Sequence, residues 1–455
     1  MPSPGGDPAA RRRPRADEPR VELELELPPG AAPFDLAAAV CSHGLFMMAP
    51  NRWDPATRAL SRPLRLASDR SASLLARVSA HPARPGDALL VAVRGAAALS
   101  PLDRDAILEQ VRRMLRLSEE EGTAVAGFQV MHAAAREAGF GRVFRSPTLF
   151  EDMVKCILLC NCQWTRSLSM STALCELQSE LKCSPRVEDL QSRTPPIREH
   201  KRKRSKKPSV RVKLETRFAE DKLEDPRLLS GTCKVLTHWE TNDNLPSLPS
   251  AASETGVTGD SLDPLELSLS DAPHLEDCIG DFPTPEELAK LDEKFLAKRC
   301  NLGYRARRII TLARSIVEGT VCLQKLEKMQ KTSATNEVSA IQSTYEKLNE
   351  ELSKISGFGP FTRANVLVCM GFFHTIPADT ETIRHLKQIH KRACTISSVH
   401  KELDKIYGNY APFQFLAYWF ELWSFYDKQF GKISDMEPSN YRLFTASHLK
   451  KSNAR

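Results

Sequence analysis

Apolar and polar residues alternate along the first part of the chain in the way that β-strands require. The run Val21-Glu-Leu-Glu-Leu-Glu-Leu27 places every second side chain on one face, which predicts a strand with one buried face. Shorter strand-like runs, separated by Pro, Gly and Asp, follow at 64–67, 74–80 and 88–93. The pattern therefore predicts an antiparallel β-sheet domain, which we place at residues 21–117.

From Asp103 onward the apolar positions take the period of an α-helix. One face of the first helix would carry Ile107, Val111, Met114 and Leu115. A second, apolar helix is predicted at 148–159, and helical patterns return from 285 to 323 and from 343 to about 427. The predicted fold class is α+β, in which the N-terminal antiparallel β-sheet domain precedes an all-α domain. We place the two parts of that helical domain at 118–184 and 282–435.

Between these two parts, residues 185–281 are rich in Ser, Pro, Gly and Asp and poor in aromatic residues. Such a segment cannot bury enough apolar surface to offset its chain entropy, which predicts a long disordered insertion. Its beginning holds the basic cluster 201–207, and its later part is acidic and Ser/Pro-rich. The cluster matches a nuclear import signal and predicts an import receptor as a partner and the nucleus as the location. The alternatives are a solvated charge run and an arm that contacts phosphates.

Composition adds few constraints. The 455 residues are 41% hydrophobic, enough for two or three domains, and the net charge of +7 only weakly favours a polyanionic partner. No stretch approaches the ~20 apolar residues of a membrane helix, so we expect no membrane association. Residues 1–20 are expected to form a disordered basic tail, with an organelle transit peptide as the alternative, and 436–455 a second basic tail.

The twelve cysteines are expected to be reduced and packed in the core rather than joined in disulfides. Cys156, Cys160 and Cys162 are closely spaced like metal ligands. They lack the second spaced pair of a zinc site, which favours core thiols.

The most specific signal is Leu352-Ser-Lys-Ile-Ser-Gly-Phe-Gly-Pro360, followed by Ile376-Pro-Ala-Asp379. Gly357 and Gly359 would let backbone N–H groups approach a phosphate, because no Cβ intervenes. A helix then leads to a Pro-restricted loop that presents the carboxylate of Asp379. A phosphate-binding turn with one positioned acid predicts an enzyme that acts on nucleic acid. Asp379 also begins a good helix N-cap sequence, and the two roles are compatible.

These motifs resemble the helix-hairpin-helix (HhH-GPD) DNA glycosylase superfamily, in particular AlkA-type 3-methyladenine DNA glycosylases and 8-oxoguanine DNA glycosylase. The resemblance covers roughly 21–184 and 282–430 and places the hairpin at 352–373. It implies that Asp379 is catalytic, stabilising positive charge on the deoxyribose and orienting water. It also implies that the hairpin binds DNA through Gly357, Phe358, Gly359, Phe361, Thr362 and Arg363.

The resemblance has further implications for cofactors and for the reaction. Relatives that also cut the DNA strand place a lysine where this chain has Phe361, so a monofunctional glycosylase without lyase activity is implied. Only Cys394 follows Asp379, so no iron–sulfur cluster is expected and no other cofactor is implied. The hairpin carbonyls that bind a monovalent cation in relatives would be those of Ser353, Ile355 and Phe358. Ser356 and Arg363 depart from the family pattern.

Two loops resemble elements of 8-oxoguanine DNA glycosylase that read the strand opposite the lesion. In Cys160-Asn-Cys-Gln-Trp-Thr-Arg166, the resemblance implies that Asn161 and Arg166 contact the orphaned base. In Asn301-Leu-Gly-Tyr-Arg-Ala-Arg307, it implies that Tyr304 wedges into the duplex and that Arg305 contacts the orphaned base. The alternatives are a helix cap for Asn161 and ordinary surface arginines.

The base pocket departs from the 8-oxoguanine enzyme. The resemblance puts Phe415 and Trp419 where that enzyme has a Gln that reads the base and a Phe that stacks on it. Such an aromatic pair suits an electron-poor alkylated base, although aromatic residues at helical spacing also occur as core.

The preferred hypothesis is a monomeric, nuclear, monofunctional DNA glycosylase of base-excision repair. It would bind double-stranded DNA and hydrolyse the N-glycosidic bond of a flipped-out alkylated purine. The alternatives are an 8-oxoguanine-type glycosylase and a non-catalytic DNA-binding protein that retains the hairpin.

Overall fold

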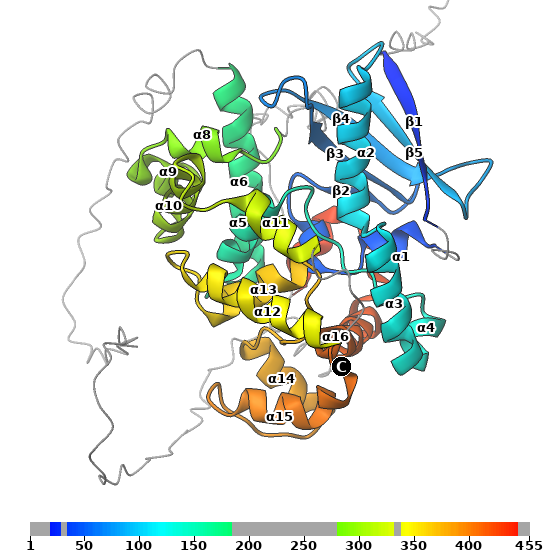
Figure 1. The fold of residues 1–455 in the computed structure, drawn as a ribbon, viewed down its shortest axis with the longest axis vertical. Coiled ribbons are helices and arrows are strands. Elements are labelled where there is room, and N and C mark those ends of the chain that lie inside the picture. Colours follow the sequence, from blue (N-terminus) through cyan, green and yellow to red (C-terminus); the bar gives the residue numbers. More distant parts are fainter. Residues whose placement is uncertain (1–18, 29–33, 184–279, 332–337, 445–455) are drawn as a thin grey trace, which may run out of the picture. The chain divides into compact units, whose positions relative to one another are not determined.

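The computed structural model describes residues 19–28, 34–183, 280–331 and 338–444. Within these ranges an antiparallel sheet comes first and helices follow, so the predicted α+β fold class is confirmed (Figure 1). Most of the expected insertion, 185–279, lies outside the described residues, as do its basic cluster at 201–207 and the chain ends 1–18 and 445–455. The predictions of nuclear import and of most of the disorder fall on those residues. The last two residues of the expected insertion, 280–281, are described, and Asp281 is buried in ion pairs rather than disordered.

The sheet has five strands in the order β1-β5-β4-β3-β2, with antiparallel pairing throughout. Alternation along β1 buries Leu23 and Leu25 and leaves Glu22, Glu24 and Glu26 exposed, as the sequence predicted. The sequence did not predict β2, which is only three residues long and has no periodicity to detect. The strands are β1 (Arg20–Glu26), β2 (Arg52–Asp54), β3 (Ala59–Arg65), β4 (Ser73–Ala80) and β5 (Ala88–Arg94).

Helix α2 (Pro101–Leu115) lies over the sheet and packs on β1 and β3 (Figure 1). Its four predicted apolar positions are all buried. The helices of the first part are α1 (Leu36–Val40), α2, α3 (Glu119–Met131), α4 (Ala133–Glu137), α5 (Leu149–Leu159) and α6 (Trp164–Cys183).

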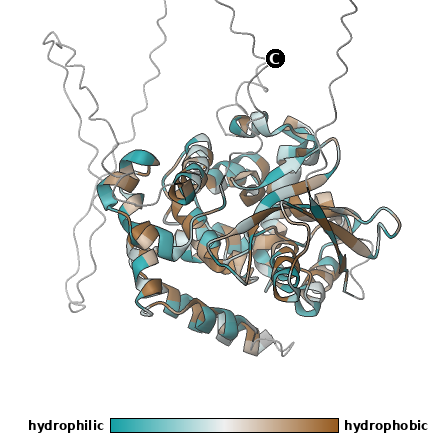
Figure 2. Ribbon diagram, turned by 90° about the horizontal axis from the view of Figure 1, so that it is seen from above, coloured by the Kyte–Doolittle hydropathy of each residue, from teal (hydrophilic) through white to brown (hydrophobic). Residues whose placement is uncertain are grey.

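The second part begins where the described chain resumes at residue 280 and is helical. Its helices are α8 (Pro285–Ala289), α9 (Glu293–Arg299), α10 (Arg305–Val317), α11 (Leu323–Lys331), α12 (Val338–Ser353), α13 (Pro360–Cys369), α14 (Thr380–Ile389), α15 (Val399–Tyr407) and α16 (Gln414–Phe430). Hydrophobic and hydrophilic residues both occur along these elements, as expected of amphipathic helices (Figure 2). No helix in the described ranges is both long and apolar enough to span a membrane.

Helix α5 joins the two parts, because α6, α10 and α13 all pack against it. It is buried on every side, and its charged residues are therefore paired inside the protein. The Glu151 carboxylate lies 2.9 Å from Arg62 of β3 and 2.7 Å from Lys155. Asp281 lies 3.5 Å from Arg62 and 2.7 Å from Arg65. These ion pairs attach the resuming chain to the sheet and to α5.

Removing one charge from this buried cluster should destabilise the fold. Burial alone would raise the pKa of Glu151, but the charges of Arg62 and Lys155 outweigh burial and lower the pKa to about 2. Glu151→Gln leaves two buried cations without a full counter-charge. We expect it to lower the free energy of unfolding by about 3–5 kcal/mol, measured by urea denaturation. The control Glu24→Gln, which removes an exposed partner of Arg84, should change it by less than about 1 kcal/mol. Equal small changes would contradict this role of the cluster.

Candidate active site and DNA-binding surface

A tight turn joins α12 to α13 and forms the predicted hairpin. The N–H of Phe358 donates to the carbonyl of Ile355, which closes the turn, and Gly357 has a φ of +85°. A Cβ at Gly357 would lie 2.9 Å from the Cδ atom of Arg308, whereas a Cβ at Gly359 would meet nothing within 4 Å. Gly357 is therefore needed for the turn itself. Gly359 caps α13 and keeps the N-terminus of that helix open to an approaching group.

The side chains of the hairpin face in different directions. Phe358 and Thr362 are buried, and the Thr362 hydroxyl lies 3.0 Å from the Cys160 thiol, so neither side chain is available for a contact with DNA. Phe361 is partly buried. The Arg363 guanidinium donates to Asn349 at 3.0 Å and to the carbonyl of Phe358 at 3.2 Å. Two of the three carbonyls expected to bind a monovalent cation, those of Ile355 and Phe358, thus already accept hydrogen bonds.

Asp379 is the N-cap of α14, and its carboxylate is held by a reciprocal capping interaction with Thr382. The Thr382 N–H and hydroxyl both donate to Oδ1 of Asp379, at 2.9 and 3.1 Å. The same hydroxyl lies 3.1 Å from the Tyr418 hydroxyl of α16. Asp379 is partly buried and forms no ion pair with any described residue. Burial raises its pKa, and the hydrogen bonds from Thr382 oppose this rise. The site thus holds a desolvated, oriented carboxylate without a cation.

Two buried arginines fix the end of α13, from which the loop to Asp379 starts. Arg116 donates to the carbonyls of Val368 at 2.7 Å and Cys369 at 3.0 Å, and Arg145 donates to Cys369 at 3.0 Å. Both guanidiniums also contact the Glu121 carboxylate. Sequence reasoning missed both residues, because isolated arginines near a helix carry no local signal of burial.

Phe415 and Trp419, the expected base-pocket pair, stack on each other with ring centroids 5.4 Å apart. Phe373 stacks on the other side of Phe415 at 6.2 Å, and the His43 ring lies 4.8 Å from Trp419. His43 and Phe373 were not predicted from the sequence. Burial, followed by the charge of Arg116, lowers the pKa of His43 to about 3, so its imidazole is neutral. Its Nδ1 atom is buried without a hydrogen-bond partner among the described residues.

The two loops expected to read the opposite strand lie together. The Tyr304 side chain is 49% exposed, and its hydroxyl donates to the carbonyl of Cys160 at 3.2 Å. Asn161 is exposed with a φ of +45°. The exposed Arg166 donates to the carbonyl of Asn301 at 3.1 Å.

Arg305, expected to contact the orphaned base, is only 2% exposed in this structure. Its guanidinium donates to the carbonyls of Cys160 and Asn161, so it joins the two loops instead of projecting from them. Arg308, which the sequence did not single out, lies between the Tyr304 ring and the hairpin. Its guanidinium carbon is 4.9 Å from the Tyr304 ring centre, and its methylene carbons lie against Gly357. Arg308 therefore connects the loop at 301–307 with the hairpin.

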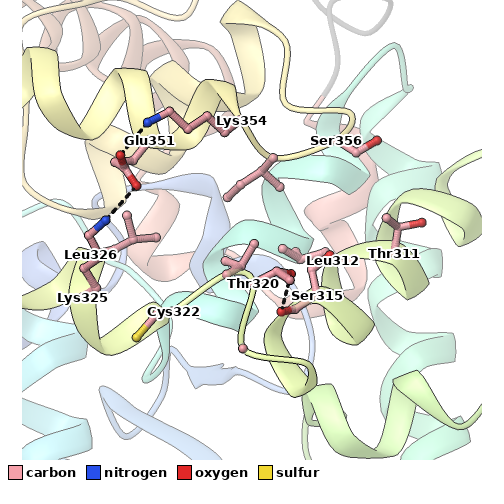
Figure 3. A pocket seen from close by; sticks show the side chains of 13 residues that line it. Thr311, Leu312, Ser315, Thr320, Cys322, Lys325, Leu326, Glu351, Lys354 and Ser356 are labelled. Atoms are coloured by element: carbon pink, nitrogen blue, oxygen red, sulfur yellow. Dashed lines mark hydrogen bonds and ion pairs between the residues drawn. The ribbon is translucent and has the colours of Figure 1, made fainter.

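A cavity of about 430 Å³ opens beside this hairpin, lined by α10, α11 and the end of α12 (Figure 3). Lys325 and Lys354 both point toward Glu351 within it, at 3.2 and 2.7 Å. Neither Asp379 nor the aromatic cluster formed by His43, Phe373, Phe415 and Trp419 lines this cavity. Its lining mixes polar side chains with Leu312, Val321, Leu326 and Ile355, and it is separate from the candidate catalytic carboxylate.

No family model matches the chain, and no curated protein matches it. Among solved structures, the chain is similar to the 3-methyladenine DNA glycosylase from Archaeoglobus fulgidus, at 12% identity and a TM-score of 0.48, covering 89% of this chain and 99% of that chain. It is also similar to the 8-oxoguanine glycosylase/lyase of Clostridium acetobutylicum in its apo form, at 12% identity and a TM-score of 0.43, covering 83% and 93%.

A third similar structure is the same Clostridium acetobutylicum enzyme in complex with double-stranded DNA containing cytosine opposite 8-oxoG, at 12% identity and a TM-score of 0.43, covering 85% of this chain and 92% of that one. These solved structures are DNA glycosylases of the two kinds that the sequence motifs resemble.

The two hairpin glycines should respond differently to alanine. Gly357→Ala forces a Cβ into a left-handed conformation and against Arg308, so we expect it to lower the free energy of unfolding by about 1–3 kcal/mol. Gly359→Ala meets open space at a helix cap and should lower it by less than about 1 kcal/mol. It should nevertheless weaken binding to duplex DNA several-fold, measured by fluorescence anisotropy. Equal stability of the two variants would contradict the observed turn. Unchanged DNA affinity of Gly359→Ala would contradict phosphate binding at α13.

Proposed function

We propose that the chain is a monofunctional DNA glycosylase that starts base-excision repair. The observation that carries this proposal is Asp379, a partly buried carboxylate with a raised pKa and no cation partner among the described residues, positioned one loop after α13. Structural carboxylates at such depth are normally paired. An unpaired and oriented one is suited to stabilising positive charge that develops on a substrate.

The proposed mechanism needs little beyond this geometry. Cleavage of the N-glycosidic bond builds positive charge on the deoxyribose, and Asp379 would stabilise that charge and orient the attacking water. Thr382 fixes one carboxylate oxygen, so the group cannot swing away. The hairpin and the exposed Tyr304 would hold the DNA backbone and fill the space of the flipped base. Phe361, at the position of the family's lysine, supplies no amine, which supports hydrolysis without strand cutting.

The aromatic cluster supports an alkylated purine as the substrate. Phe415 and His43 are buried, so the partly exposed Trp419 is the ring of this cluster that would meet a base, and the three residues supply no amide to read 8-oxoguanine. Aromatic faces attract electron-poor, cationic bases. The second candidate is an 8-oxoguanine-type glycosylase, which the adjoining loops of Asn161 and Tyr304 favour. We also propose a monomer that is imported into the nucleus through residues 201–207.

Asp379→Asn should abolish base release while preserving the fold. Asparagine keeps the helix cap but has no charge, so we expect the single-turnover rate to fall by at least about 100-fold. The free energy of unfolding should be unchanged or slightly higher, because a buried charge is removed. Labelled duplexes carrying alkylated, oxidised or deaminated bases would be incubated with each protein and split into samples with and without alkali.

Strand breaks that appear only after alkali, with wild type and not with Asp379→Asn, would support the proposal and identify the substrate. Breaks without alkali would show lyase activity and overturn the monofunctional assignment. DNA binding without base release from any duplex, equal in both proteins, would favour a non-catalytic binding module.

The rate should also depend on pH through Asp379. Burial raises the pKa of Asp379. As the pH is lowered, the rate should therefore begin to fall at a higher pH than it would for an aspartate with an ordinary pKa. Protonation of this group favours the folded state, since its pKa is higher in the folded chain than in the unfolded one, so the loss would not reflect unfolding. Single-turnover rates across the acid range, with circular dichroism as a check on folding, test this. A rate that stays constant down to about pH 4 would contradict an essential ionised Asp379.

A further inference from the structure

Three potential metal ligands converge where the C-terminal end of α14 meets α16. The Nε2 atoms of His385 and His390 each lie 2.7 Å from the same oxygen, Oε1 of Glu421. The three ligand atoms all lie within 4.8 Å of one another. None of these residues belongs to the catalytic or DNA-binding groups described above, and the sequence motifs did not single them out.

If hydrogen bonds alone held this cluster, a single carboxylate oxygen would have three donors. One carboxylate oxygen would accept from two imidazoles and also from the Tyr407 hydroxyl at 3.3 Å. The other carboxylate oxygen takes part in none of these contacts. His385 is fully buried, and its Nδ1 atom has no partner among the described residues. Convergence of this kind is typical of ligands around a cation, where lone pairs rather than protons point to the centre.

We propose that His385, His390 and Glu421 form a binding site for a divalent transition-metal ion, with Zn²⁺ as the expected occupant. Two imidazole nitrogens and one carboxylate oxygen are a ligand set that zinc accepts. Zinc lies about 2.0–2.2 Å from such ligands and its tetrahedral ligands lie about 3.3 Å apart. Each of the two N–O pairs at 2.7 Å would therefore open by roughly half an ångström to admit it. The Tyr407 hydroxyl lies beside the proposed site, 3.1 Å from Nε2 of His390 and 3.3 Å from Oε1 of Glu421.

The site is reachable from solvent on one side. The side chains of His390 and Glu421 are 23% and 33% exposed, whereas His385 forms its buried wall. An ion would join the C-terminal end of α14 to α16. The N-terminal end of α14 is already linked to α16 through Thr382 and Tyr418. The metal would therefore hold the helix that begins at Asp379 from its far end, and its role would be structural.

Metal content measures this directly and does not depend on any glycosylase activity. The full chain would be stripped with a chelator, dialysed against Zn²⁺, and analysed by inductively coupled plasma mass spectrometry. Parallel samples loaded with Co²⁺ would be examined by visible absorption. The test variants are His390→Gln and Glu421→Gln, which alter partly exposed ligands. The matched control is His400→Gln, which replaces an exposed histidine on the neighbouring α15.

We expect wild type and His400→Gln to retain about one more zinc ion per chain than His390→Gln and Glu421→Gln retain. Zinc should raise the melting temperature of wild type and not that of His390→Gln. Cobalt should give ligand-field absorption that is lost in both test variants. The proposal would be overturned if wild type and the test variants had the same zinc content, melting temperature and cobalt absorption. That outcome would leave a purely hydrogen-bonded cluster.

Discussion

The candidate site depends on how the C-terminal end of α13 is held. Peptide carbonyls at a helix C-terminus carry partial negative charge and need donors. Here Arg116 and Arg145 supply them from inside the protein, at Val368 and Cys369. Burial lowers the pKa of Arg145 to about 9, although the Glu121 charge opposes this, so both guanidiniums are substantially desolvated. Their desolvation is offset because each has several carbonyl and carboxylate acceptors.

This anchor connects three elements that lie far apart in the sequence. The guanidinium of Arg116 lies 5.5 Å from the Phe373 ring centre, and Phe373 stacks on Phe415. The same arginine lowers the pKa of His43, after burial. Arg116 therefore contacts or influences α13, the start of the loop to Asp379 and the aromatic cluster. A shift of Arg116 would move the carboxylate and the aromatic cluster together.

Local patterns in the sequence were enough to predict most of the strands and helices, although not β2, and the turn. The alternation at 21–27, the helical face of α2 and the capping sequence at Asp379 each involve residues within one element. The features that the sequence did not predict are contacts between residues far apart in the chain. His43 meets Trp419, Arg308 lies between Tyr304 and Gly357, and Arg305 turns inward to Cys160. No periodicity or spacing encodes such contacts, because each depends on how separate helices pack.

Residues near the sheet also complete the candidate site. The indole N–H of Trp419 donates to the carbonyl of Ser42 at 2.8 Å, and that of Trp423 donates to Cys41 at 2.8 Å. These bonds orient the two indoles, because each ring has a single N–H donor. Helix α16 thereby presents Trp419 to His43 on one side and Tyr418 to Thr382 on the other. Helix α16 therefore contacts the aromatic cluster through one side chain and the Asp379 cap through the next. Because the segment at 41–43 orients α16, it helps to position both.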